Sequence, residues 1–246
     1  MKVIDMHSHI WLSKYENDKA DILKAVEAYN IDKVFVSGLA SYTPDKESVK
    51  KINDEVYKFA KEEPKHIKSY VYISPEHDNA LDVMKSGIEE HGAIGTKIWV
   101  SEKCDAFSMN QIAEQSIEYN LPVLIHTFQK AMGGVANEST AVNVRNLALR
   151  YPELKIVMAH IGGNAYHGVP LIKDLKNVWV DISGTDFLGD VLPYTIENIG
   201  AERVLFGSDG PGAFLTSLGQ VFDADISDEE REQILYKNAQ KVYNLK

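Results

Sequence analysis

Short apolar runs, rich in β-branched residues, recur along the whole chain. Within each run the apolar residues are nearly continuous, which is typical of strands buried on both faces of a parallel sheet. The eight runs cover residues 3–6, 33–37, 69–73, 93–99, 122–125, 155–159, 177–182 and 203–206. The pattern therefore predicts eight buried strands.

Helical patterns lie between these runs. Residues 45–63 carry four apolar side chains spaced three, four and three residues apart, which predicts a helix with one buried stripe that stops at Pro64. The stripe consists of Val49, Ile52, Val56 and Phe59. Further helices are expected over residues 80–90, 108–117 and 143–150.

Three local signals mark the ends of the predicted helices. Ser108 followed by Gln111, and Ser227 followed by Glu230, have the spacing of a capping box at a helix start. Gly92 is placed to end the helix over residues 80–90. The last helix has an apolar side made of Ile234, Leu235, Val242 and Tyr243.

The alternation of strands and helices, at roughly one strand per 30 residues, favours a single-domain (β/α)8 TIM barrel over residues 1–246. A doubly wound open sheet is the competing architecture, because strand counting alone does not separate the two. The glycine pairs at 133–134 and 162–163 do not form a GxGxxG or GxxxxGKS/T phosphate loop.

Composition narrows the class of protein. The 246 residues are 44% hydrophobic and 25% charged, which is typical of a globular chain, and the net charge of −10 argues against a nucleic-acid partner. No run approaches the ~20 apolar residues that span a bilayer, and no hydrophobic signal core follows Met1, so we expect a cytoplasmic protein. With Cys104 as the single cysteine, any metal must be bound by histidines and carboxylates.

Polar residues stand where the predicted strands end. His7 and His9 follow the first strand, His126 the fifth, His160 the sixth and Asp209 the eighth. Barrel enzymes carry their chemistry at this end of the strands, and residues two apart on a strand face the same side. Several imidazoles and a carboxylate around one point would form a site for zinc, iron or manganese.

The remaining histidines fall in predicted helices or loops, where a surface position is expected. They are His66, His77, His91 and His167.

Four of the strand-end segments carry a family resemblance. The sequences VIDMHSH at 3–9, VLIH at 123–126, IVMAHIGG at 156–163 and LFGSDGP at 205–211 resemble the amidohydrolase superfamily. The chain is most similar to the amidohydrolase-2 branch, which includes the aminocarboxymuconate-semialdehyde decarboxylase-like enzymes. Lys237-Asn238-Ala239, followed by Val242-Tyr243, also resembles the terminal helix of that branch.

The resemblance implies a (β/α)8 barrel that holds a divalent metal, with Zn2+ favoured over Mn2+ or Fe2+ and one ion favoured over two. By position, His7, His9, His126 and Asp209 would be metal ligands. His160 would bind a second metal or act as a catalytic acid/base beside the first.

Lys97 matches a position where some members of the superfamily carry a carboxylated lysine between two metals. An ordinary lysine whose ammonium reaches solvent or a carboxylate is the favoured interpretation.

The main functional prediction is a hydrolase for an amide, ester or lactone of a small molecule. A metal lowers the pKa of bound water from 15.7 to about 7. Asp209 would bind the metal and take the proton of this water, and His160 would stabilise the oxyanion or share the proton transfer. Trp11 and Trp99 are candidate substrate-binding walls, or else they pack on neighbouring helices. Residues 127–139, with Lys130, form either a lid that offers a cation or an ordinary surface loop.

Decarboxylation within the same branch is the alternative. It calls for a carboxylate anchor, usually an arginine, and none of the four arginines obviously ends a strand. They are Arg145, Arg150, Arg203 and Arg231.

Two further hypotheses are weaker. TatD-like or PHP-like phosphoesterases also begin with H-x-H, but TatD-like proteins carry a metal-binding glutamate where this chain has Lys97. A barrel that only binds metal or a partner protein is disfavoured because all five strand-end residues are present. Asp181, Ser183 and Asp186 are candidates without assigned roles. We expect a small-molecule substrate and no membrane partner, and the sequence leaves the oligomeric state open, a homo-oligomer included.

Overall fold

The computed structural model describes residues 2–184 and 188–245. Its strands are β1 (Ile4–Trp11), β2 (Lys33–Leu39), β3 (Ile67–Ser69), β4 (Val71–Ile73), β5 (Thr96–Ile98), β6 (Val123–Ile125), β7 (Ile156–Met158), β8 (Val178–Asp181) and β9 (Val204–Leu205). Its α-helices are α1 (Tyr15–Tyr29), α2 (Lys46–Glu62), α3 (Ala80–Glu89), α4 (Met109–Glu118), α5 (Ala141–Arg150), α6 (Ala165–Ile172), α7 (Val191–Ile199), α8 (Phe214–Asp223), α9 (Asp228–Glu232) and α10 (Asn238–Val242). None of the helices in the described ranges is both long and apolar enough to cross a membrane.

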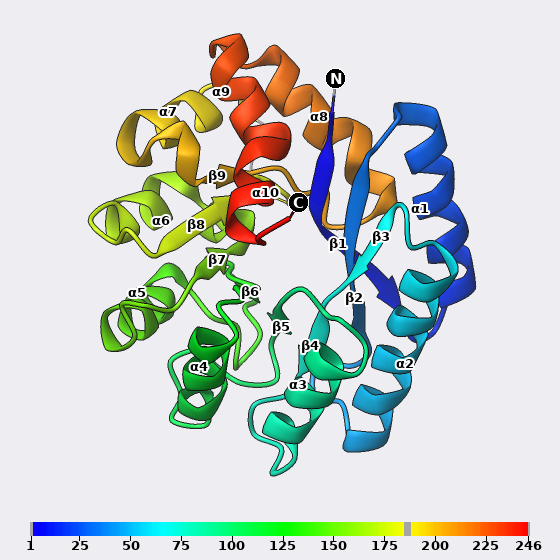
Figure 1. Ribbon diagram of the computed structural model, residues 1–246. Helices are drawn as coiled ribbons and strands as arrows, with labels where there is room; N and C mark the ends of the chain where they lie inside the picture. Colours follow the sequence, from blue (N-terminus) through cyan, green and yellow to red (C-terminus); the bar gives the residue numbers. More distant parts are fainter. Residues whose placement is uncertain (1, 185–187, 246) are drawn as a thin grey trace.

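The strands form a closed parallel barrel. The ladders run β1-β2-β3 and β4-β5-β6-β7-β8-β9, and β3 and β4 are one strand interrupted at Tyr70. The Tyr70 N–H donates to the Val36 carbonyl oxygen (2.9 Å), and the Met6 N–H donates to the Phe206 carbonyl oxygen (3.0 Å). These bonds join the two ladders, so the barrel prediction is confirmed and the open sheet is wrong. Figure 1 shows the helices in a ring around the strands.

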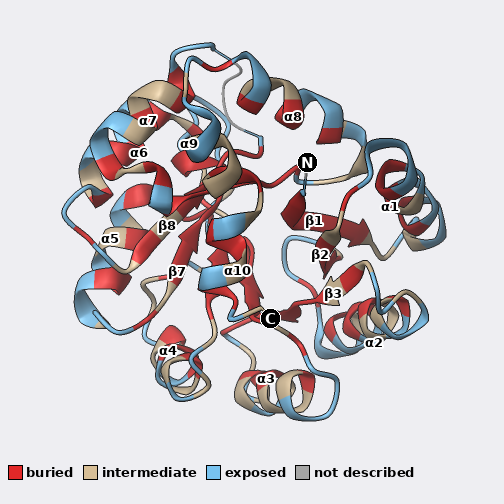
Figure 2. Ribbon diagram, turned by 45° about the horizontal axis from the view of Figure 1, so that its top comes forward, coloured by how far each residue is buried: buried red, intermediate tan, exposed pale blue. Residues whose placement is uncertain are grey.

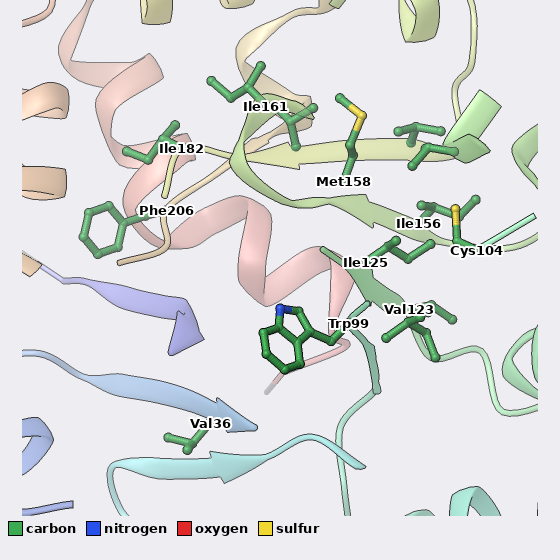
Figure 3. Packing of buried hydrophobic residues seen from close by; sticks show 14 of the residues in the cluster. Val36, Trp99, Cys104, Val123, Ile125, Ile156, Met158, Ile161, Ile182 and Phe206 are labelled. Carbon is green, nitrogen blue, oxygen red and sulfur yellow. The ribbon is translucent and has the colours of Figure 1, made fainter. Parts of the chain in front are cut away.

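Each strand buries both of its faces, as its apolar run predicts. Ile98, Ile125 and Met158 lie side by side in register and belong to the large apolar cluster between strands and helices. The residues that alternate with them along the same strands, such as Leu124 and Val157, point inward and fill the barrel interior. Figure 3 shows part of the outer cluster, and Figure 2 shows the strands buried and the helices exposed on their outer sides.

The floor of the barrel is closed by aromatic side chains. The Tyr70 hydroxyl donates to the Met6 carbonyl oxygen (2.7 Å) and is also hydrogen-bonded to the hydroxyl of Tyr243. The ring of Phe35 packs against Tyr243 with the centroids 5.0 Å apart. Tyr243 comes from the C-terminal segment, which lies across one end of the ring of strands (Figure 1). The chemistry is therefore confined to the opposite end.

Most predicted helices form, with one error in the caps. The stripe on α2 is buried, and Ser227 and Glu230 make a capping box at α9. The expected box at Ser108 is wrong: this residue has helical angles, and its hydroxyl is hydrogen-bonded to Glu102 instead of capping α4. The sequence spacing matches a capping box, but the Ser108 hydroxyl donates to the nearby Glu102 carboxylate instead of accepting from a backbone N–H group.

Candidate metal centre

The first strand places two histidines together at the mouth of the barrel. The apolar run predicts a strand that ends before His7, but β1 continues to Trp11. Its pairing with β2 has a register irregularity between Asp5 and Ser8. His7 and His9 share one side of the strand, and their Nε2 atoms lie 2.9 Å apart. Gly207 is required beside them, because a Cβ there would lie 2.8 Å from the Cβ of His7.

His126 directly follows β6, whereas His160 lies in a strained turn after β7. His160 (φ 62°) and Ile161 (φ 47°) both occupy the left-handed region, which is unfavourable for a residue with a side chain and most of all for a β-branched one. The His126 Nδ1 and His160 Nε2 atoms lie 3.0 Å apart. The strain is thus located where an imidazole is aimed into the site.

Asp209 brings a carboxylate to the same place. It also has a positive φ (64°), and its backbone N–H donates to the His7 carbonyl oxygen (2.7 Å). Its Oδ1 atom lies 3.4 Å from the His7 Nε2 and 3.2 Å from the His9 Nε2. Its side chain is 41% exposed, so the carboxylate faces the mouth. All five residues predicted from the strand ends therefore converge.

Each central histidine is held at its outer ring nitrogen by a group outside the cluster. The contacts are His7 Nδ1 with Asp181 Oδ2 (3.0 Å), His9 Nδ1 with Ser37 Oγ (2.7 Å), His126 Nε2 with Glu138 Oε1 (2.9 Å) and His160 Nδ1 with the Ser183 carbonyl oxygen (2.8 Å). A carboxylate or carbonyl oxygen only accepts, so the hydrogen-bond network assigns the proton to the outer nitrogen wherever one of these is the partner. The inner nitrogen then presents a lone pair to the centre.

Lone pairs that face each other cannot hydrogen-bond, but a cation between them satisfies both. Two ligands about 2.1 Å from one metal, at angles of about 90–110°, lie about 3.0–3.4 Å apart. The inner atoms of His7, His9 and Asp209 are separated by 2.9, 3.2 and 3.4 Å. Donor atoms of His7, His160 and Asp209 also lie within 4.8 Å of one another. These side chains fit a divalent metal.

The electrostatics suit metal binding at neutral pH. Burial lowers the pKa of His7 well below its usual range, lowers that of His9, and lowers that of His126 to about 4. Burial alone would raise the pKa of Asp209, but the hydrogen bond from His9 and the charge of His160 bring it well below the ordinary value. His7, His9 and His126 are therefore neutral at pH 7, and Asp209 is an ionised carboxylate.

Lys97 is not a surface lysine. It lies on β5, is fully buried, and places its Nζ atom 3.0 Å from the His7 Nε2. The expectation that its ammonium reaches solvent is wrong, because the inward face of β5 points at the cluster. Burial lowers the pKa of Lys97 to about 8, so it remains mostly protonated at pH 7 and donates to the same lone pair that a metal would use.

A pocket of about 360 Å³ opens beside the cluster. It is lined by His9, Asp209, Trp11 and Lys14, among others. Trp99 is buried behind Trp11, with the ring centroids 5.4 Å apart. Trp11 can therefore contact a ligand directly, whereas Trp99 would support it from behind.

The groups that hold the histidines were only partly anticipated. The sequence singles out Asp181 and Ser183 as candidates without a role, but it does not identify Glu138. Asp186, the third such candidate, lies outside the described residues. Glu138 also accepts from Lys130 Nζ (2.7 Å), so this cation is already paired. Although burial opposes it, the bonds from His126 and Lys130 lower the pKa of Glu138 to about 2. A lone acid in a loop gives no signal in the sequence until the fold brings it to a histidine.

None of the arginines contacts the described part of the cluster. Arg145 pairs with Asp174 and Arg150 bonds to Asn110, whereas Arg203 and Arg231 hold backbone carbonyl oxygens. Among the described residues the centre thus contains Lys97 as its buried cation but no guanidinium.

Comparison with known proteins fits this geometry. The family model described as Amidohydrolase, the amidohydrolase-2 group, matches residues 4–245. The chain belongs to the amidohydrolase family. The resemblance inferred from the strand-end motifs is therefore confirmed.

Solved structures share the fold of this amidohydrolase over its whole length. The 2,6-dihydroxybenzoate decarboxylase from Rhizobium has a TM-score of 0.82 at 16% identity, covering 100% of this chain and 99% of the other. The 5-carboxyvanillate decarboxylase from Sphingomonas paucimobilis has a TM-score of 0.79 at 15% identity, covering 100% and 99%. A dihydroxybenzoic acid decarboxylase from Polaromonas sp. JS666, with bound manganese and the inhibitor 2-nitroresorcinol, has a TM-score of 0.79 at 17% identity, covering 99% and 97%.

Proposed function

We propose that this protein is a metal-dependent decarboxylase of a small carboxylic acid. The observation that carries the proposal is the convergence of His7, His9 and Asp209 donor atoms at 2.9–3.4 Å beside an open pocket. Support comes from the decarboxylases among the structures that share the fold. This choice reverses the order expected from the sequence, where hydrolysis stood first.

The reaction converts R–CO2− and a proton into R–H and CO2. The C–C bond to the carboxylate breaks, its electron pair stays on the carbon, and a proton takes the place of CO2. A bound divalent metal would supply positive charge to the substrate's oxygens. His7, His9, His126 and Asp209 would hold this metal. His160 would take up a second proton at Nε2, in addition to the one that its Nδ1 donates to Ser183, and deliver it to the carbon.

The remaining residues would bind and orient the substrate. Trp11 offers an apolar face to an unsaturated or aromatic acid, with Trp99 as its support. Lys97 would add positive charge beside the carboxylate. Because the barrel floor is closed by Tyr70 and Tyr243, the site also excludes bulk water from below.

The metal itself is part of the proposal. Three imidazoles with one carboxylate suit Zn2+, Mn2+ and Fe2+. Zinc is our expectation from the donor set, and the manganese in the Polaromonas decarboxylase makes Mn2+ the first alternative. Elemental analysis of the purified protein would give the metal and its stoichiometry. One equivalent is expected, and His7→Ala is the control that should lose it.

Hydrolysis of an amide, ester or lactone is the second candidate, favoured by one observation. The decarboxylase reaction usually uses an arginine as carboxylate anchor, and all four arginines are engaged elsewhere in the described structure. In this case Asp209 would take the proton of the attacking water.

One assay separates the candidates. The metal-loaded protein is incubated with panels of aromatic carboxylic acids and of esters, lactones and amides. Release of CO2 without new carboxylate supports the proposal. New carboxylate without CO2 would replace it by the hydrolase, and His160→Asn identifies activity that depends on the site.

A further inference from the structure

Glu138 differs from the other groups that hold the central histidines because it lies in a long loop. Asp181 and Ser37 belong to strands, and Ser183 is the second residue after one. Residues 126–140 join β6 to α5, and Glu138 turns back from this loop to His126 with its side chain buried. One histidine of the cluster therefore depends on the conformation of a loop.

The loop is attached at its ends and exposed in the middle. Asn137 Nδ2 donates to the Ser101 carbonyl oxygen (2.7 Å), and the Gln129 N–H donates to the Gly162 carbonyl oxygen (2.9 Å). Lys130 Nζ donates to Glu138 Oε1 (2.7 Å), which closes the loop upon itself. Met132, between these attachments, is 90% exposed.

The contact with Glu138 fixes which nitrogen of His126 is free. The carboxylate only accepts, so the His126 Nε2 carries the proton and Nδ1 carries the lone pair. This lone pair faces that of the His160 Nε2 at 3.0 Å, because His160 donates from Nδ1 to the Ser183 carbonyl oxygen. The His126 Nδ1 lone pair is then available to a metal.

Without the carboxylate the opposite tautomer would be preferred. A proton on the His126 Nδ1 would make a direct hydrogen bond to the His160 Nε2 and consume both lone pairs. That bond leaves the His126 Nδ1 without a lone pair for a cation. Glu138 opposes this tautomer because it would then face the unprotonated Nε2 of His126, acceptor against acceptor.

We propose that Glu138 is a positioning residue that keeps the His126 Nδ1 lone pair open to a divalent cation, so that metal binding and the closed loop stabilise each other. The inference rests on the proposed metal-dependent function and extends it to the loop over residues 127–139. The coupling is reciprocal: the factor by which the closed loop raises metal affinity is the factor by which metal favours the closed loop.

The first test measures metal affinity without any substrate. Metal-free wild type, Glu138→Gln and Glu138→Ala are titrated with Zn2+ or Mn2+ against a chromophoric chelator. The exposed Glu153→Gln variant is the matched control. Residues that orient metal ligands typically contribute 10- to 100-fold, so Glu138→Ala should lose roughly that factor, whereas Glu138→Gln, whose amide oxygen can still accept from the His126 Nε2, should retain more of the wild-type affinity. Imidazole ¹⁵N NMR should show His126 protonated at Nε2 in the metal-free wild type and at Nδ1 in Glu138→Ala.

The second test reads the loop. Lys130 is the one trypsin site between residues 127 and 139. Saturating Zn2+ or Mn2+ should slow cleavage after Lys130 in the wild type by roughly the factor seen in affinity, and should not slow it in Glu138→Ala. The fragment that begins at Ala131 identifies this cut.

A structural role alone would give a different result. Glu138→Ala would then unfold or be cleaved more readily, while its metal affinity stayed within twofold of wild type and the His126 tautomer was unchanged; this outcome overturns the inference. A wild type that binds metal but releases no CO2 would refute the proposed reaction and leave the role of Glu138 supported by these two tests.

Discussion

Replacing Asp181 by asparagine tests how the site sets the tautomer of its first ligand. The carboxylate is fully buried, with Oδ2 3.0 Å from the His7 Nδ1. Its Oδ1 accepts from the N–H groups of Ser183 (2.9 Å) and His160 (3.4 Å). In Asp181→Asn the amide oxygen would stay with these donors, so the NH2 group would turn to His7. The His7 Nδ1 must then accept, and its proton moves to Nε2, where a metal would bind.

The size of the effect follows from that exchange. Returning the proton to the His7 Nδ1 would break the bond from the asparagine NH2 group and leave two buried donors facing each other without an acceptor, which costs about 1–3 kcal/mol. At about 1.4 kcal/mol per factor of ten, metal affinity should fall roughly 10- to 100-fold, which agrees with the usual contribution of residues that orient metal ligands. The amide has the volume of the carboxylate, so the metal-free variant should remain folded.

The assay is a chelator competition with Zn2+ or Mn2+, combined with imidazole ¹⁵N NMR on the metal-free protein. Asp174→Asn is the control, because that exposed carboxylate pairs with Arg145 far from the cluster. Wild-type metal affinity in Asp181→Asn, with His7 still protonated at Nδ1, would refute the reasoning.

Four further predictions follow from the described contacts. Asp209→Asn should remain folded and lower kcat by orders of magnitude, and near-normal turnover would remove Asp209 from the mechanism. Lys97→Met should bind metal at least as tightly as wild type, because the ammonium group of Lys97 competes with a metal for the His7 Nε2. Weaker binding, together with an intact mass that shows an added carboxyl group in the wild type but not in the variant, would indicate a metal-bridging carboxylated lysine. Cys104 is buried and burial raises its pKa to about 12, so thiol reagents should label it only after unfolding, and rapid native labelling would contradict its placement. The metal-free protein should lose stability as pH falls from about 6.5 towards 4, because its unfolded histidines take up protons that folded His126 (pKa about 4) does not; a melting temperature that rises over this range would contradict the shift.

The fold could be predicted because burial on both faces of a strand leaves a direct trace in the sequence. Runs such as 122–125 and 155–159 are typical of strands buried in a parallel sheet. The end of β1 was misplaced because His7, Ser8 and His9 are polar, and polarity was interpreted as the end of the strand. His7 and His9 stay in the strand because Asp181 and Ser37 provide hydrogen-bond partners for their side chains inside the barrel.

The five central residues could also be predicted, since each follows or ends an apolar strand. Their outer partners could not, because contacts between Asp181 and His7, or Glu138 and His126, depend on the angle of each ring. The left-handed backbone at His160 is likewise invisible in the sequence, where only the glycines after it hint at a special turn.

The tyrosine seal at the bottom of the barrel has a kinetic consequence. Because Tyr70, Phe35 and Tyr243 fill the floor of the barrel, substrate and product must enter and leave through the same mouth, one after the other. A non-gaseous product that dissociates slowly therefore blocks entry of the next substrate molecule. We expect inhibition by this product to be competitive with substrate.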